Sequence, residues 1–200
     1  MAKRIAIAVL LLGAMVAVLF LYMPRNNAPQ MSMSGPTVPV IGGPFTLTDA
    51  KGNTVTNETL KGRRALVFFG FTHCPDICPT TLQNVKQALD IFGKPDAVQV
   101  VFVTVDPERD TQQAMVDYMA NFDPRFMALT GTPEQIIAVS KAFRVYAAKV
   151  PLRDTEGKAT GDHTMSHSGM MYLMAADGSY IGHISANATA DEIASALKGA

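Results

Sequence analysis

The longest apolar run of the chain lies near its start. Residues 5–23 contain no charged residue and no proline. As a helix these 19 residues would be about 28 Å long, close to the hydrocarbon thickness of a bilayer. Lys3 and Arg4 precede the run and only Arg25 follows it directly, so the positive-inside rule leaves residues 1–4 in the cytoplasm. The pattern predicts a single-pass signal anchor. A cleaved secretory signal is the alternative, but its apolar region is usually shorter.

A polar interval separates this run from a globular pattern. Residues 24–42 are rich in proline, asparagine, serine and methionine, which predicts a flexible linker. From there short apolar runs alternate with amphipathic stretches, which predicts one domain over residues 43–200. Two β-like pieces flank residues 50–53, a plausible hairpin. Continuous apolar runs at 64–71 and 97–105 predict strands that are covered on both faces.

Three amphipathic stretches predict helices that bury one side. Apolar residues recur at three- and four-residue steps within 82–92, 114–119 and 136–143. Asp110 is the expected N-cap of the second helix, and Thr132–Gln135 form the capping box of the third. The residues before the third helix, 126–131, predict a short strand. These stretches therefore alternate with the strands along the chain.

The order of elements changes near the C-terminus. A turn at 176–178 separates the apolar runs 169–174 and 179–184, which is a strong hairpin signal, and residues 189–192 cap a last helix. The order is βαβαβα followed by ββα, which implies right-handed crossovers between parallel strands and an added antiparallel pair. The predicted fold class is α/β: a thioredoxin-like mixed sheet flanked by helices, with an N-terminal hairpin and a single N-terminal transmembrane helix.

Composition narrows the set of partners. Lysine plus arginine and aspartate plus glutamate both number 17, so the formal charge is zero. Because there is also no basic stripe with interleaved aromatic residues, we expect no nucleic-acid partner. The chain has only two cysteines, too few for a disulfide scaffold, and their proximity indicates a single site.

The cysteines fall where strand 64–71 turns into the first helix. Cys74 lies in the turn and Cys78 near the helix start. If the first helical turn includes both, their spacing places the sulfurs on one face, where unpaired N–H groups and the helix dipole favour thiolate. Three interpretations are open: a structural pair, a redox pair and a metal site. The first is the weakest, because a helix N-terminus in an exported domain is a poor place for inert cysteines.

A metal site needs a further ligand, and the candidates are the four histidines. His73 would point away from the cysteines, and His183 lies within a strand. His163 and His167 lie before the first strand of the C-terminal hairpin, in the segment that faces the cysteine turn of a thioredoxin-like fold. His167 is nearer to the strand and is the predicted ligand.

Two thiolates and an imidazole are soft to borderline donors. They suit copper as Cu(I), Cu(II) or both, and particularly three-coordinate Cu(I). Structural zinc normally takes four protein ligands, a number that His163 would complete. Met165, Met170 and Met171 also favour Cu(I), although methionines of a strand usually fill the core.

Four segments carry a resemblance to a known family: "FFGFTHCPDICPTTL", "VFVTVDPERDT", "FMALTGTPEQI" and "HSGMMYLMAADG". They resemble the Sco/SenC proteins, membrane-anchored copper chaperones for cytochrome c oxidase assembly, and cover most of residues 45–197 in family order. The resemblance implies that Cys74, Cys78 and His167 bind copper. It also implies delivery to the binuclear copper centre of an oxidase subunit, with reduction of that subunit's cysteines as a further role.

The predicted function is that of a copper chaperone without turnover of its own. It would be held in a bacterial inner membrane with its domain in the periplasm, with an oxidase subunit as recipient and other periplasmic copper carriers as further partners. The alternative is an enzyme, a thiol-disulfide reductase acting on oxidase cysteines or in redox signalling. A copper sensor or adaptor would share the site, whereas a peroxidase is disfavoured because no arginine adjoins Cys74.

Two further segments have plainer interpretations. Residues 106–110 match the family, and a helix cap with an ion pair between aspartate and arginine accounts for them. Residues 150–166 are polar and contain two glycines, which predicts a long loop. Such a loop would close over the copper or contact the partner protein.

Overall fold

The computed structural model describes Met15 and residues 40–200. Apart from Met15, the predicted signal anchor lies outside the described residues, and so does the predicted linker up to residue 39. Residues 40–200 belong to one compact unit. Within the part of the chain that is described, no helix has both the length and the apolar character needed to cross a bilayer.

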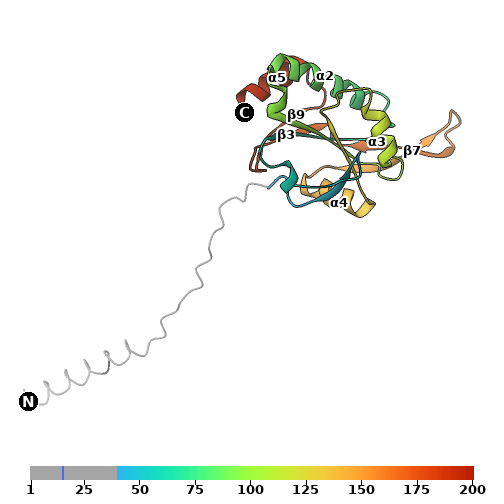
Figure 1. Ribbon diagram of the computed structural model, residues 1–200. Helices are drawn as coiled ribbons and strands as arrows, with labels where there is room; N and C mark the ends of the chain where they lie inside the picture. The colour runs from blue at the N-terminus through green and yellow to red at the C-terminus, as the bar shows by residue number, and fades with distance from the viewer. Residues whose placement is uncertain (1–14, 16–39) are drawn as a thin grey trace, which may run out of the picture. The chain divides into compact units, whose positions relative to one another are not determined.

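A seven-stranded mixed sheet forms the centre of the domain (Figure 1). Its order is β2-β1-β5-β4-β3-β8-β9. The three middle strands are parallel, and β1 and β8 pair antiparallel with β5 and β3. This confirms the predicted mixed sheet and the two hairpins. The strands are β1 (Thr46–Asp49), β2 (Thr54–Thr56), β3 (Arg64–Gly70), β4 (Val98–Thr104), β5 (Met127–Thr130), β8 (Met170–Met174) and β9 (Tyr180–Ser185).

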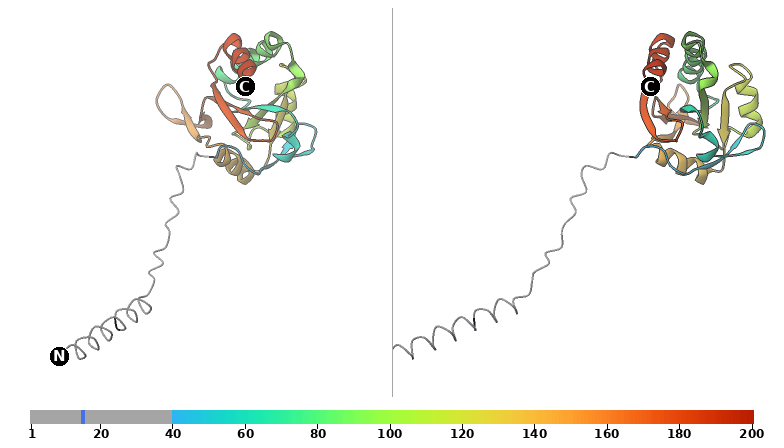
Figure 2. Two further views of the ribbon diagram at one scale, coloured as in Figure 1. Left: turned by 90° about the vertical axis from the view of Figure 1, so that its left-hand side faces the viewer. Right: turned by 60° about the vertical axis from the view of Figure 1, so that its left-hand side comes forward.

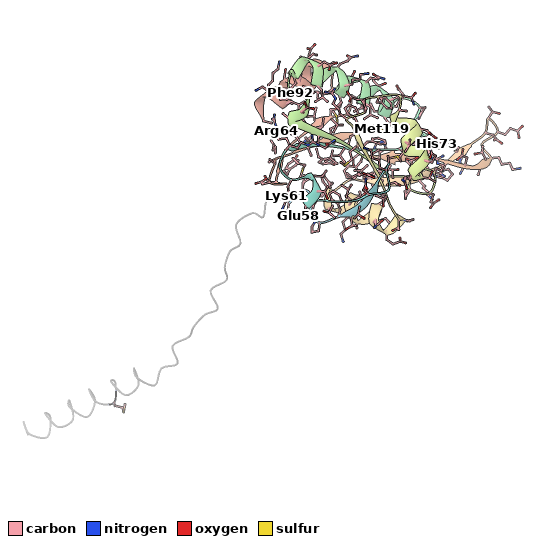
Figure 3. The ribbon with its side chains drawn as sticks, viewed as in Figure 1. Glu58, Lys61, Arg64, His73, Phe92 and Met119 are labelled. Atoms are coloured by element: carbon pink, nitrogen blue, oxygen red, sulfur yellow. The ribbon has the colours of Figure 1, made fainter. Side chains whose placement is uncertain are left out.

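Helices cover both faces of this sheet. Helices α2 and α5 pack side by side on one face, and α4 lies on the opposite face (Figures 1 and 2). Arg64 on β3 joins α2 and α5 to the sheet. Its guanidinium lies over the ring of Phe92 on α2 (Figure 3) and donates hydrogen bonds to the carbonyls of Leu197 and Ala200 at the end of α5. The helices are α2 (Ile77–Phe92), α3 (Gln112–Met119), α4 (Pro133–Ala142) and α5 (Ala190–Gly199), with the short turns η1 (Glu58–Leu60) and η2 (Pro95–Ala97).

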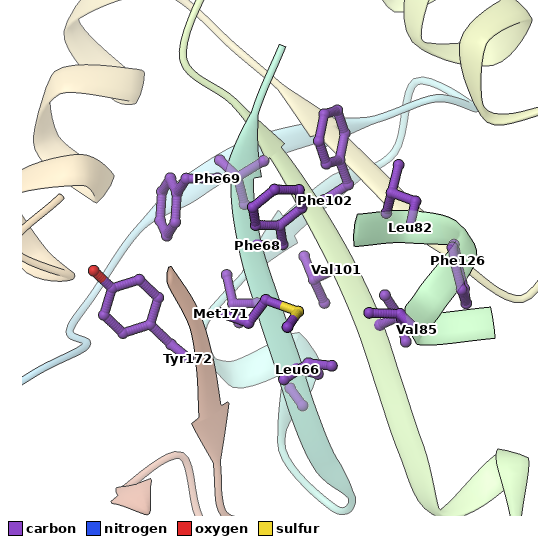
Figure 4. Close-up of a cluster of buried hydrophobic side chains, with 14 of the residues drawn as sticks. Leu66, Phe68, Phe69, Leu82, Val85, Val101, Phe102, Phe126, Met171 and Tyr172 are labelled. Atoms are coloured by element: carbon purple, nitrogen blue, oxygen red, sulfur yellow. The ribbon is translucent and has the colours of Figure 1, made fainter. Parts of the chain in front are cut away.

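Burial on both faces explains why β3 and β4 are continuous apolar runs in the sequence. All seven residues of β4 are buried, and so are six of the seven residues of β3. Successive side chains of β3 enter opposite halves of the core. Phe68 packs on Phe102 towards α2, and Phe69 packs on Tyr172 on the other side (Figure 4). Both faces of the sheet are therefore covered, as predicted.

The predicted loop over residues 150–166 is wrong. This segment belongs to a β-hairpin of β6 (Ala147–Arg153) and β7 (Ala159–His167), which forms a separate two-stranded sheet. The hairpin projects from the domain (Figures 1 and 2). Because every residue from 151 to 162 is exposed, the hairpin lacks the apolar alternation that marks a half-buried strand. The one sequence signal for this hairpin is Gly157, which adopts a positive φ in the turn between its strands.

Two capping predictions have different outcomes. Thr132 and Gln135 form the predicted capping box of α4. The predicted cap of α3 is wrong, because Thr111 rather than Asp110 accepts the backbone N–H of Ala114. Asp110 is fully buried and its carboxylate binds elsewhere. Its partners lie beside the cysteine turn.

Candidate metal-binding site

Both cysteines lie at the junction of β3 and α2, as predicted, and both are free thiols. Helix α2 begins at Ile77, so Cys78 is in its first turn and Cys74 is in the turn before it. The Sγ atom of Cys74 accepts a hydrogen bond of 3.4 Å from the backbone N–H of Cys78. The sulfur thus takes the place of a side-chain cap, because Asp76 at the N-cap position makes no such bond.

The two thiols differ in exposure and in acidity. Cys74 is 8% exposed and Cys78 is fully buried. A hydrogen bond from the Cys78 thiol is the largest cause that lowers the pKa of Cys74, to about 4, against the effect of burial. That same hydrogen bond and burial raise the pKa of Cys78 above its ordinary value. The pair therefore carries one thiolate, on Cys74, at neutral pH.

His167 ends β7 and turns its ring towards the sulfurs. Its Nε2 atom lies 3.8 Å from Sγ of Cys78. Its Nδ1 atom lies 3.1 Å from the carbonyl oxygen of Ser168. Since a carbonyl only accepts, the proton of a neutral ring is on Nδ1, and Nε2 presents a lone pair to the site. The ring of Phe71 stands perpendicular to the imidazole at 5.8 Å and fixes its orientation.

The distance between sulfur and imidazole matches that between two ligands of one ion. A metal bound at usual bond lengths holds a thiolate sulfur and an imidazole nitrogen roughly 3.5–3.8 Å apart. Within residues 40–200, no three His, Cys, Asp or Glu side chains are yet gathered around a common point. Binding therefore requires an adjustment.

Gly70 makes room for the buried sulfur. A Cβ atom at this position would lie 2.9 Å from Sγ of Cys78 and 2.6 Å from the ring of Phe102. Both distances are shorter than van der Waals contact, so a larger residue would displace the sulfur or the ring. We did not predict this role. The signal was a glycine inside an apolar strand, which often marks a close approach.

A hollow of about 450 Å³ opens beside the sulfurs and the imidazole. It connects solvent with Cys74 and His167, while Cys78 lies beneath them. An ion or a partner's side chain can thus reach the site from this side. The hollow is lined by Phe71, Cys74, Pro75, Asp76, Ile77, Thr164, Met165, Ser166, His167 and Gly169.

The other three histidines hydrogen-bond with partners other than the cysteines. Nε2 of His163 lies 3.3 Å from the carboxylate of Asp106, so it is not placed as a fourth ligand in this structure. His73 is exposed (Figure 3), and its ring hydrogen-bonds with the hydroxyl of Thr72. His183 pairs with the hydroxyl of Tyr180 at 2.6 Å.

The three methionines near His167 differ in position. Met171 is fully buried in the core, and Met170 is 42% exposed. Met165 is half-buried and lines the hollow beside the site. Core filling is therefore confirmed for Met171, and Met165 packs against the edge of the core.

Comparison with known proteins decides the family. The profile of the SCO1/SenC family matches residues 34–200. The chain belongs to the SCO1/SenC family. "Protein sco1" of Schizosaccharomyces pombe is 36% identical over 202 residues, which cover 96% of this chain and 76% of that protein. "Protein SCO1 homolog, mitochondrial" of Homo sapiens is 37% identical, and the match covers 80% of this chain but only about half (52%) of the human protein.

A solved structure supports the same SCO1/SenC assignment. "Structure of Bradyrhizobium japonicum ScoI with copper bound" is 46% identical, with a TM-score of 0.71. The match covers 80% of this chain and 98% of that structure. The fold of the domain is thus that of the SCO1/SenC family, and the Bradyrhizobium japonicum protein is a relative that has been seen with copper.

Proposed function

We propose that this protein is a copper chaperone that binds one copper ion through Cys74, Cys78 and His167 and passes it to another protein. The observation that carries the proposal is the 3.8 Å approach of His167 Nε2 to Cys78 Sγ at the bottom of an open hollow. A set of two thiolates and one imidazole suits Cu(I). Membership of the SCO1/SenC family and the copper-bound relative support the same ion.

The proposed cellular location of the domain rests on the N-terminal sequence. The uncharged run 5–23 is proposed to anchor the chain in a bacterial inner membrane, with residues 43–200 in the periplasm. The recipient is proposed to be the oxidase subunit that holds the binuclear copper centre, with other periplasmic copper carriers as donors. The family resemblance of the sequence supports these partners.

The two thiols differ in exposure and acidity, so we expect them to bind and release copper in a fixed order. An arriving ion first meets the thiolate of Cys74 at the mouth of the hollow, and Cys78 then loses its proton and binds from below. His167 completes the site through Nε2, because its Nδ1 faces the carbonyl oxygen of Ser168. Loading therefore releases about one proton per ion. A recipient's thiolate exchanges with Cys74 first, because Cys78 is covered.

Copper titration of the full chain in detergent tests the proposal. Reduced wild type is expected to bind one Cu(I) per chain. His167→Ala should weaken binding by roughly 100-fold, because each ligand of a structural metal site contributes about 3 kcal/mol. His183→Ala is the matched control, since this exposed histidine pairs only with Tyr180, and its affinity should equal that of wild type. Equal affinities for all three proteins would refute the assignment of His167.

A second function, reduction of a partner's disulfide, is favoured by the acidity of Cys74. Its thiolate would attack the disulfide, form a mixed disulfide and release one partner thiolate. Cys78 would then lose its proton, attack Cys74 and release the second thiolate, so that one disulfide is reduced for each Cys74–Cys78 disulfide formed. His167→Ala should leave this exchange largely intact, and Cys78→Ser should stop it at the mixed disulfide. Absence of a trapped adduct would exclude this function.

A further inference from the structure

The turn that follows β4, Asp106–Asp110, holds two buried carboxylates. Both Asp106 and Asp110 are fully buried. A buried charge is costly unless it is paired or hydrogen-bonded, so their partners show what the turn does. One carboxylate binds the segment that leads to the cysteines, and the other binds the strand that ends in His167.

Asp110 fixes the segment before Cys74. Its carboxylate accepts the backbone N–H of Thr72 at 3.0 Å and the hydroxyl of Thr72 at 2.6 Å. It also accepts the hydroxyl of Thr104 on β4 at 2.6 Å. Thr72 is two residues before Cys74, so these bonds hold the start of the cysteine turn against the end of β4.

Asp106 and Arg109 fix β7. Asp106 accepts the Nε–H of Arg109 at 2.6 Å and lies 3.3 Å from Nε2 of His163. Arg109 Nη1 donates to the carbonyl of His163 at 2.8 Å and to the carboxylate of Asp162 at 3.1 Å. His163 is four residues before His167 on the same strand, and in a strand these two side chains point to the same face.

The hairpin depends on this turn for its polar contacts with the domain. It forms its own two-stranded sheet and pairs with no strand of the main sheet. Within residues 40–200, the side-chain hydrogen bonds and ion pairs that join residues 147–167 to the rest of the domain end on Asp106, Glu108 and Arg109. The contacts of His167 with the cysteines are the exception.

We infer that Asp106, Arg109 and Asp110 are positioning residues that set the distance between the two cysteines and His167. This inference rests on the proposed copper function. Asp110 holds the cysteine side through Thr72, and Arg109 with Asp106 holds the histidine side through His163. When Arg109 is lost, β7 keeps its strand pairing with β6 but loses its anchor, and His167 occupies its place less often.

Arg109→Gln tests the inference, with Arg125→Gln as the matched control. Arg125 also pairs with a buried aspartate, Asp123, at the same distance of 2.6 Å, but it lines a different hollow from the one beside Cys74. Cu(I) affinity of the full chain in detergent is expected to fall about tenfold for Arg109→Gln, the lower end of the loss seen when groups that orient metal ligands are removed. Arg125→Gln should leave the affinity unchanged.

A double-mutant cycle separates positioning from general loss of stability. In the His167→Ala background, Arg109→Gln should cause no further loss of affinity, because the ligand that it positions is already gone. X-ray absorption of copper-loaded Arg109→Gln should show a reduced nitrogen contribution. His163→Gln, which keeps a donor for Asp106, should stay within about threefold of wild type, whereas His163→Ala should resemble Arg109→Gln.

The outcomes distinguish the inference from the function on which it rests. If wild type fails to bind copper, the proposed function fails. If wild type binds and Arg109→Gln binds equally well, or if Arg109→Gln loses as much affinity in the His167→Ala background as in wild type, the positioning role is refuted while the copper function stands.

Discussion

Cys74 and Cys78 stand where a buried strand meets a 16-residue helix, whereas His167 stands at the end of a projecting hairpin that pairs with no strand of the main sheet. The sulfurs are fixed by the core itself, through Gly70 below and Asp110 beside them. The imidazole of His167 lies against two aromatic rings, those of Phe68 and Phe71, and the strand that carries it is held by polar contacts of His163. A chaperone must bind an ion and then release it. A fixed pair of thiols opposite a lightly held imidazole meets both needs.

Removing a ligand from the fixed side should have the largest effect. Cys78→Ser takes away the buried sulfur, which no other donor can replace because the position is closed to solvent. We expect Cu(I) affinity to fall roughly 100- to 1000-fold, about 3–4 kcal/mol for one ligand of a metal site. Competition with a coloured Cu(I) chelator measures it. A loss smaller than that of His167→Ala would contradict the division between a fixed and a lightly held side.

The pH dependence of alkylation distinguishes the two thiols. The pKa of Cys74 is lowered to about 4, so its reaction with iodoacetamide in metal-free protein should be independent of pH between 6 and 8. An ordinary thiol gains about 80-fold in thiolate over that range. Cys78 should react slowly throughout, because it is buried and its pKa is raised. A rate that climbs with pH at Cys74 would show that its thiol is not acidified.

The lowered pKa of Cys74 also makes the free energy of unfolding depend on pH. Because the pKa of Cys74 is lower in the folded chain than the unfolded value of about 8.5, the unfolded state binds more protons between these values. The contribution of this thiolate is therefore complete above pH 8.5 and is lost as the pH falls towards 4. Cys74→Ser should remove this part of the pH dependence of the free energy of unfolding in metal-free protein.

Gly70→Ala should give the smallest of these effects. The added methyl group meets Sγ of Cys78 and the ring of Phe102, and such overpacking costs about 1–3 kcal/mol. We expect a lower urea midpoint and about tenfold weaker copper binding, because the sulfur is pushed from its place. Gly182→Ala on β9 is the matched control, since a Cβ there meets nothing within 4 Å. Equal behaviour of both variants would show that Gly70 leaves no special space.

The core of the domain and the projecting hairpin also differ in how much of their structure the sequence predicts. β3, β4 and the capping box of α4 could be predicted because their signals are local: continuous burial on both faces and a cap three residues from its partner. The β6–β7 hairpin could not, because an exposed strand needs no apolar alternation.

The candidate metal site likewise has features that the sequence predicts and features that it does not. The spacing of the cysteines predicts their shared place at the start of a helix, and the element order brings His167 opposite them. The contacts of Asp110 with Thr72, and the space at Gly70, join residues that lie far apart in the chain. Only the folded structure shows such pairs, and for that reason the sequence pattern wrongly predicts Asp110 as a helix cap.

X-ray absorption of the copper-loaded full chain tests the central claim most directly, because it counts the atoms bound to the ion. Wild type should show two sulfur neighbours and one imidazole nitrogen, and His167→Ala should show two sulfurs without that nitrogen. An unchanged nitrogen signal in His167→Ala, or a single sulfur in wild type, would contradict this claim.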